Sequence, residues 1–258
     1  MKHTVTALML VLVLAFCING TIVQAQQGGL HAPSGGTRTI TQSINVPPLP
    51  NAPFTATVST STIRKLDDGG TITLQNHRTI ARDAAGRIYQ ERRNFLPAGD
   101  TSENIINQIE LSDPLAHMLI MCHPSEQTCT ISSYLRTPSP AHVIPTGPYA
   151  DGAGDLAREA LGDKIVNGVE TVGTRETSTI NASAFGNNNP IVVVKEFWYS
   201  PVLGINVIEK RQDPRFGDQS FAVSDITLGE PDMRLFQMPA NFKVVDLRTP
   251  VGVSKANN

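Results

Sequence analysis

Apolar and polar residues alternate along much of this 258-residue chain, in short runs that are separated by turn residues. A period of two residues is typical of β-strands, because successive side chains point to opposite faces of a sheet. Glycine, proline and asparagine mark the turns between the runs. The runs that we predict as strands are 54–63, 71–82, 87–95, 104–111, 117–122, 129–135, 164–166, 170–180, 191–199, 204–212 and 219–228.

The strands follow one another at short intervals, apart from a proline-rich stretch at residues 136–153. This spacing favours antiparallel pairing of neighbours. We therefore predict a mainly β fold, a curved antiparallel sheet resembling a half-barrel, with long proline-rich loops. One short helix is expected at Leu156–Leu161, because Asp155 suits the N-cap position and Gly162 suits the helix end.

The N-terminus has the order of a secretory signal. Lys2 precedes an apolar run over residues 4–18, and Val23-Gln24-Ala25 places small or apolar side chains where signal peptidase inspects the chain. We expect cleavage after this triplet. A lipoprotein signal that ends at Cys17 is the alternative, although a lipid-modified cysteine usually follows a small residue and Phe16 is large.

These patterns divide the chain into four parts: a signal peptide at 1–25, a disordered linker at 26–53, a single β-rich domain at 54–248 and a flexible tail at 249–258. The linker is rich in glycine and proline, a composition that buries little apolar surface. After cleavage the protein is expected outside the cytoplasm, either in the periplasm or secreted.

Charge and hydropathy exclude two classes of partner. The formal net charge is −2, and loss of Lys2 with the signal makes it one unit more negative. Nucleic-acid binding needs a basic surface against the phosphates, so we expect no nucleic-acid partner. No second apolar run reaches the roughly 20 residues of a membrane-spanning helix, so no transmembrane segment is expected in the mature chain.

Two cysteines remain after the signal, Cys122 and Cys129, on either side of a six-residue loop between two strands. In an oxidising compartment this arrangement favours a hairpin disulfide. A metal site formed by Cys122, His123 and Cys129 is the alternative, but it lacks a fourth ligand at a usual spacing.

The sequence has no recognisable catalytic motif: no Gly-x-Ser-x-Gly, Ser-x-x-Lys, His-Glu-x-x-His or P-loop pattern is present. Residues 152–157 match the dinucleotide-binding fingerprint in letters, yet a proline-rich segment precedes them where a strand is required. We therefore assign no catalytic residue, no metal and no cofactor. A non-enzymatic protein is expected, and an enzyme with a dispersed site is the less favoured alternative.

Five arginines make the first predicted hairpin locally basic, and they are Arg78, Arg82, Arg87, Arg92 and Arg93. Acidic residues between them dilute the charge. We interpret the cluster as a solvated strand face, and a site for an anionic lipid headgroup or an acidic peptide is the alternative.

Three consecutive aromatic residues, Phe197, Trp198 and Tyr199, end the most β-prone run, and Trp198 is the only tryptophan. In a strand, Phe197 and Tyr199 point to one face and Trp198 to the other. Core packing explains this arrangement, and a ligand-lined concave face is the alternative. We take the three residues as candidate ligand-facing positions.

Several motifs resemble those of a large group of uncharacterised exported bacterial β-rich proteins. The matching segments are Asp83–Arg87, Glu91-Arg92, Leu161–Val169, Gly173–Arg175, Phe197–Pro201, Asp213–Gly217 and Leu235–Pro239. More distantly, the tryptophan strand, the turn after it and the final Phe-x-x-Pro resemble the half-barrel of lipoprotein carriers and periplasmic sigma-factor regulators. That resemblance implies a curved sheet around an apolar cavity that binds acyl chains or lipoprotein signals.

Our leading hypothesis is an exported, non-enzymatic protein that binds an apolar ligand, such as a lipid or a lipoprotein segment, on a curved sheet. The alternative is an envelope interaction or structural domain whose core is filled by its own side chains. Bound lipid, or its absence, distinguishes the two.

We predict that the mature protein begins at Gln26, because cleavage after Val23-Gln24-Ala25 fits the signal pattern. N-terminal sequencing of the exported protein checks this. Retention of Met1, or a diacylated Cys17, would contradict it.

Overall fold

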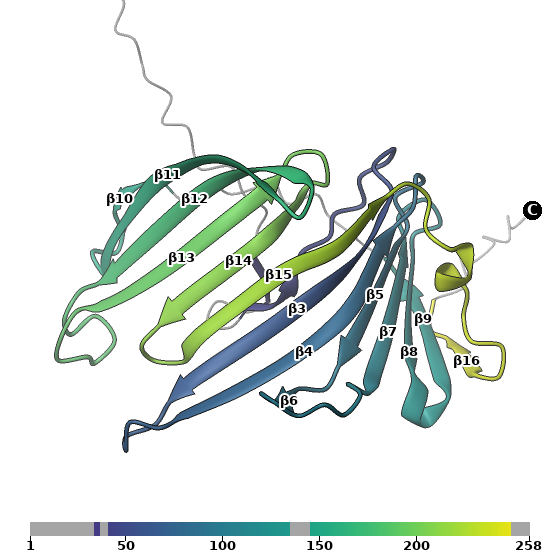
Figure 1. The fold of residues 1–258 in the computed structure, drawn as a ribbon, viewed down its shortest axis with the longest axis horizontal. Helices are drawn as coiled ribbons and strands as arrows, with labels where there is room; N and C mark the ends of the chain where they lie inside the picture. The colour runs from purple at the N-terminus through teal and green to yellow at the C-terminus, as the bar shows by residue number, and fades with distance from the viewer. Residues whose placement is uncertain (1–33, 37–40, 135–144, 249–258) are drawn as a thin grey trace, which may run out of the picture.

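The computed structural model describes residues 34–36, 41–134 and 145–248, and most of them belong to one large, curved and unclosed sheet of 14 strands (Figure 1). The sheet is antiparallel except where β16 (Lys243–Asp246) pairs in parallel with β9 (Thr128–Ser133). The predicted mainly β, curved antiparallel fold is confirmed. Within the described residues, no helix has the length and apolar composition to span a bilayer.

The strands of the first half are β3 (Phe54–Lys65), β4 (Thr71–Arg82), β5 (Ile88–Arg93), β6 (Leu96–Pro97), β7 (Ile106–Asp113) and β8 (Met118–His123). Those of the second half are β10 (Gly147–Pro148), β11 (Gly154–Val166), β12 (Val169–Ile180), β13 (Ile191–Ser200), β14 (Ile205–Asp213) and β15 (Gly217–Leu228). The remaining elements are β1 (Ser34–Gly36), β2 (Thr41–Ile44), and the short 3-10 helices η1 (Pro124–Glu126) and η2 (Met233–Phe236).

Strand order places β10, from the middle of the chain, at one edge of the sheet and β16, the last strand of the chain, at the other. The order is β10-β11-β12-β13-β14-β15-β3-β4-β5-β7-β8-β9-β16, with β6 added beside β4. The join between the halves is the pairing of β15 with β3, which runs from Asp218 opposite Ile63 to Leu228 opposite Phe54. Figure 1 shows these two strands crossing the centre of the molecule.

The two faces of the sheet bury different cores. We name them the Phe54 face and the Ser59 face, after alternate positions of β3. On the Phe54 face, Phe54, Val58 and Phe221 belong to a core that includes residues from both halves of the sheet. On the Ser59 face, a second core lies over β5 to β9 and packs against partly buried apolar residues of η2 and the chain after it.

Part of the expected linker is folded. We predicted a linker over 26–53, but Ile44 and Val46 are 1% and 5% exposed and belong to the core of the Phe54 face. Their chain is fixed because Arg82 donates hydrogen bonds to the carbonyls of Pro47 and Ala52. The prediction is therefore wrong for residues 43–53. Residues 1–33, which hold the expected signal peptide, and the tail at 249–258 lie outside the described residues.

The expected helix at Leu156–Leu161 is also wrong, because these residues lie within β11. Leu156 pairs with Ser178 and Ala160 with Thr174 on β12, and the register shifts once, between Ala160 and Gly162. A helix of two turns has marginal stability by itself. The long ladder with β12 supplies more hydrogen bonds, so tertiary pairing overrides the local helix preference.

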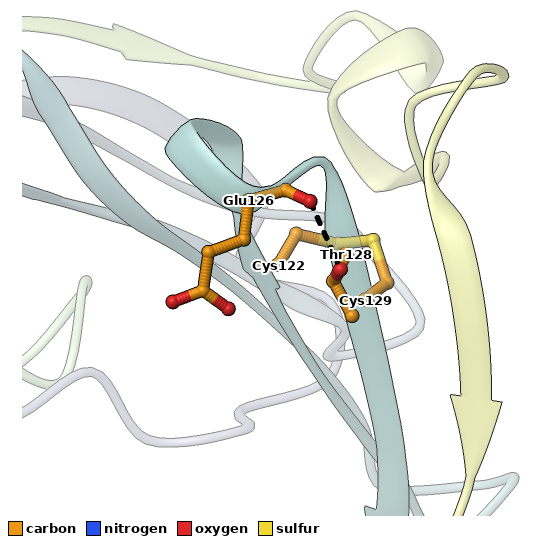
Figure 2. Close-up of a disulfide and its surroundings, with 4 residues drawn as sticks. All are labelled: Cys122, Glu126, Thr128 and Cys129. Atoms are coloured by element: carbon orange, nitrogen blue, oxygen red, sulfur yellow. Dashed lines mark hydrogen bonds between the residues drawn. A yellow bond between two sulfur atoms is a disulfide. The ribbon is translucent and has the colours of Figure 1, made fainter.

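The predicted hairpin disulfide is present in the structure. Cys122 on β8 and Cys129 on β9 are directly opposite each other, and their sulfur atoms are bonded (Figure 2). Between them, the hydroxyl of Thr128 donates a 3.0 Å hydrogen bond to the carbonyl of Glu126. Both cysteines are 0% exposed and belong to the core of the Ser59 face. Neither sulfur is available as a metal thiolate, as the alternative site would require.

Replacing both cysteines with serine should destabilise the protein by about 2–2.5 kcal/mol, because the unfolded chain regains the entropy of the closed loop. Urea unfolding measures this loss, and the β-rich circular dichroism spectrum should be kept. Reductant should lower the stability of the wild type and leave the variant unchanged. Two reactive thiols in the denatured, unreduced wild type would contradict the bridge.

Candidate functional site

A row of alternating charges crosses the Ser59 face over four neighbouring strands. Arg175 on β12 lies 2.9 Å from Glu159 on β11 and 3.4 Å from Glu196 on β13, and Lys210 on β14 lies 3.6 Å from Glu196. These residues are register partners, so the sheet itself aligns them. Exposed pairs of this kind contribute about 0–1 kcal/mol each. Their effect is to build a wall of long, polar side chains.

Beside this wall the side chains become small. The same row continues from Lys210 to Ser220 on β15, Ser61 on β3 and Gln75 on β4. Ala222 and Ser59 occupy the next row on the same face. The two central strands therefore form a low floor between taller neighbours.

The floor belongs to two adjoining hollows, which share Ser61 and Ser220 and which we together call the serine groove. The first has a volume of about 570 Å³ and is lined by ionic residues of the charged row and by the apolar Ile63 and Val194. The second has a volume of about 430 Å³ and is bounded by the chain from Leu96 to Asn104. The groove thus combines apolar contact with charged and hydroxyl groups.

A break in the sheet positions the far side of the groove. The pairing of β4 with β5 covers only Ile80–Arg82, so the backbone N–H of Thr79 donates instead to the Glu91 carboxylate at 2.9 Å. Asn104 bridges the same gap, where its side-chain oxygen accepts from the backbone N–H of His77 at 3.4 Å. Side chains therefore replace the missing ladder, and they hold the loop beside the floor.

Glu91 is held ionised at this break. Its carboxylate also accepts hydrogen bonds from the Tyr89 hydroxyl and the Arg93 guanidinium, both at 2.8 Å. Burial opposes ionisation, but the bonds from Arg93 and from the backbone N–H of Thr79 prevail, so the pKa of Glu91 lies below its ordinary value.

Trp198 lies on the same face as the charged row and contacts it. Its indole N–H donates to Glu196 at 2.9 Å, and the Lys164 ammonium lies 3.4 Å from its ring centroid. Partial burial opposes ionisation of Glu196, but the Trp198 indole and the Lys210 ammonium prevail, so the pKa of this carboxyl group lies below its ordinary value. Glu196 is therefore an anion at neutral pH.

The three candidate aromatic residues do not meet at one site. Phe197 is 1% exposed on the Phe54 face, and Trp198 is 8% exposed on the Ser59 face, as strand alternation predicts. Tyr199 is half-buried. None of the three lines the serine groove. Their ligand-facing role remains a prediction.

The interpretation of the basic hairpin as a solvated strand face is wrong for two of its arginines. Arg78 and Arg82 are 3% and 0% exposed, on the Phe54 face. Burial lowers the pKa of Arg78 to about 9. The other three form ion pairs, with guanidinium nitrogen to carboxylate oxygen distances of 2.6 to 3.7 Å. The pairs are Arg87 with Asp83, Arg92 with Glu110 and Arg93 with Glu91.

Sequence reasoning missed the residues of the serine groove. Lys210, Ser220 and Ser61 are far apart in the chain, and only the strand register brings them together. One local signal was available. The run Ser59-Thr60-Ser61 places small side chains on one face of β3, where a half-exposed strand commonly has larger residues. Within the described residues, no group of three or more His, Cys, Asp and Glu side chains is placed to hold a metal ion.

Comparison with known proteins gives likeness at the level of fold. No family model and no curated protein matches the chain. An uncharacterized conserved protein from Thermus thermophilus is 11% identical, with a TM-score of 0.38 over 76% of this chain and 90% of that one. A chain of the MucA/MucB complex from Pseudomonas aeruginosa is 13% identical, with a TM-score of 0.37 over 75% of this chain and 58% of that one.

A LolA superfamily protein from Nitrosomonas europaea is 12% identical, with a TM-score of 0.28 over 73% of this chain and 91% of that one. These structures are similar to this chain in fold alone. At this identity and TM-score, the likeness carries no information about function.

Changing Gly173 to alanine should displace Trp198. A Cβ at residue 173 would lie 2.6 Å and 2.7 Å from two ring carbons of Trp198 and 2.8 Å from Leu161. We expect a loss of roughly 1–3 kcal/mol in stability and a red-shifted emission, because the ring must move toward solvent. Since Trp198 is the only tryptophan, its fluorescence reports this directly. Gly70→Ala, in an exposed turn, is the control, and an unchanged spectrum for Gly173→Ala would contradict the packing.

Proposed function

We propose that this chain is an exported, non-enzymatic binding protein that holds an amphipathic ligand, a lipid or a lipoprotein segment, in the serine groove. The observation that supports this is the composition of the larger hollow. Ile63 and Val194 offer apolar contact, and Arg175 and Lys210 offer positive charge beside them. A ligand with an apolar part and an anionic part fits such a surface.

The filled interior of the Phe54 face supports placing the ligand on the other face. Ile44, Val46 and Leu203 occupy the core of the Phe54 face and are at most 5% exposed. A ligand in that core would have to displace them. The serine groove is already open to solvent, and its floor of small side chains permits close approach.

The disulfide supports the extracytoplasmic part of the proposal. Such bonds persist in oxidising compartments and are rare in the cytosol. The bond between Cys122 and Cys129 agrees with the secretory signal expected from the first 25 residues.

The filled core also favours a second candidate, an envelope interaction or structural domain that holds no small ligand. In that case the charged row and the groove floor would contact another macromolecule. The two candidates differ in one measurable respect, the presence of a bound amphiphile in the purified protein.

Ser61→Trp should abolish ligand retention, because the indole would rise from the floor into both hollows of the groove. Native mass spectrometry of protein purified from its producing cells should show an adduct of lipid or lipopeptide mass on the wild type and none on the variant. Ser133→Trp, at an exposed position on β9, is the matched control and should keep the adduct. An unmodified wild type would favour the interaction domain, and an adduct retained by Ser61→Trp would exclude the groove.

A further inference from the structure

A further hollow lies on the Phe54 face, at the end of the central strands where β14 turns into β15. Its volume is about 480 Å³. The residues that line it toward this face are Thr62, Arg64, Arg211, Arg215, Phe216 and Gln219. We call it the arginine pocket. It lies on the opposite side of the same strands from the serine groove.

The turn after β14 fixes two of the three guanidinium groups. Asp213 has a side chain that is 0% exposed, and its carboxylate lies 2.6 Å from the Arg211 guanidinium and 2.8 Å from that of Arg215. The Arg215 backbone N–H donates to the same carboxylate at 3.0 Å. At the end of the turn, Gly217 has φ +89° and approaches Ile63 so closely that an added Cβ would lie 2.2 Å from its carbonyl oxygen. The turn and its two arginines are therefore tightly positioned.

Phe216 restrains the same two groups from one side. The guanidinium carbons of Arg215 and Arg211 lie 5.2 Å and 5.9 Å from the centroid of its ring. Contact with a ring face holds a guanidinium while leaving its N–H edge available to an acceptor. Arg64 reaches the pocket from β3, across β15 from the turn.

Charge in the pocket is unbalanced. Three guanidinium groups line it, whereas Asp213 supplies a single buried carboxylate to two of them. Asp218 also borders the pocket, but its register opposite Ile63 places its side chain on the Ser59 face. Arg64 forms no ion pair within the described part of the chain. The local excess of positive charge favours an anion with several acceptor oxygens.

We propose that the arginine pocket binds a phosphate group. Guanidinium groups present paired N–H donors that match the oxygens of phosphate, and the hydroxyl of Thr62 adds a further donor. The exposed Phe216 ring offers apolar contact to whatever carries the phosphate. The group belongs either to a soluble phosphate or to the headgroup of a phospholipid. This site is separate from the proposed ligand groove.

Calorimetric titration of the full-length protein with inorganic phosphate tests the soluble source. Co-sedimentation with phosphatidylcholine vesicles, with and without phosphatidylglycerol, tests the lipid headgroup. Whichever probe binds the wild type, Arg64→Gln should weaken its binding about tenfold, because one charge-assisted contact is lost. Arg64 is exposed, so the variant should fold, and circular dichroism checks this.

Arg234→Gln is the matched control, because it removes an exposed arginine outside the pocket. Arg234 pairs with Asp232 in the same Asp-x-Arg spacing as Arg215 with Asp213. The control variant should bind phosphate or vesicles as the wild type does. Binding to phosphate identifies a soluble ligand, and binding only to vesicles with phosphatidylglycerol identifies a headgroup. The proposal is wrong if neither probe binds, or if Arg64→Gln binds as well as Arg234→Gln. The adduct in the serine groove should be unaffected by Arg64→Gln, so the two sites are tested independently.

Discussion

The guanidinium of Arg82 is buried on the Phe54 face, where β4 ends beside the start of β3, and the arrangement of both chain halves depends on it. It donates four hydrogen bonds, two to the carbonyl of Ala52 and one each to those of Pro47 and Leu203, at 2.8 to 2.9 Å. Its carbon also lies 5.0 Å from the Phe54 ring centroid. Burial lowers its pKa to about 10, so the group remains charged at neutral pH. Since a buried charge is costly unless it is hydrogen-bonded, this set of carbonyls must stay in place.

Because Arg82 fixes these carbonyls, the chain segments that carry them cover the Phe54 face of the sheet. The N-terminal segment and the connection from β13 to β14 are drawn onto the Phe54 face, where Ile44 and Leu203 complete its core. Where the Phe54 face is filled by this core, it has no room for an acyl chain. The hollows that could bind a ligand therefore lie where small side chains or a sharp turn leave space at the surface. The floor at Ser61 and Ser220 is the first kind, and the turn at Gly217 is the second.

Sequence reasoning recovered what depends on neighbours along the chain. The strands from 54 to 82 and from 191 to 228 were predicted nearly in place, because the period of two residues is a local property. The helix at Leu156–Leu161 was wrong because the pairing of β11 with β12 outweighs local propensity. The linker was wrong for residues 43–53 because its partner, Arg82, is remote. The serine groove could not be predicted, since it exists only after seven strands align in register.

The Asp-x-Arg pairs show why a charged motif by itself does not identify a site. Asp213-Pro-Arg215 and Asp232-Met-Arg234 have the same spacing, and in both an arginine binds the preceding carboxylate. Asp232 and Arg234 have side chains 46% and 86% exposed, where water competes for the same contacts, although hydrogen bonds from Arg234 lower the pKa of Asp232 to about 2. The Asp213 side chain is 0% exposed, and β3 brings Arg64 beside the turn that follows it. Of these two pairs, Asp213 is the one that holds its arginines beside a further positive charge, so burial and register, rather than the motif, distinguish an anion pocket from a surface ion pair.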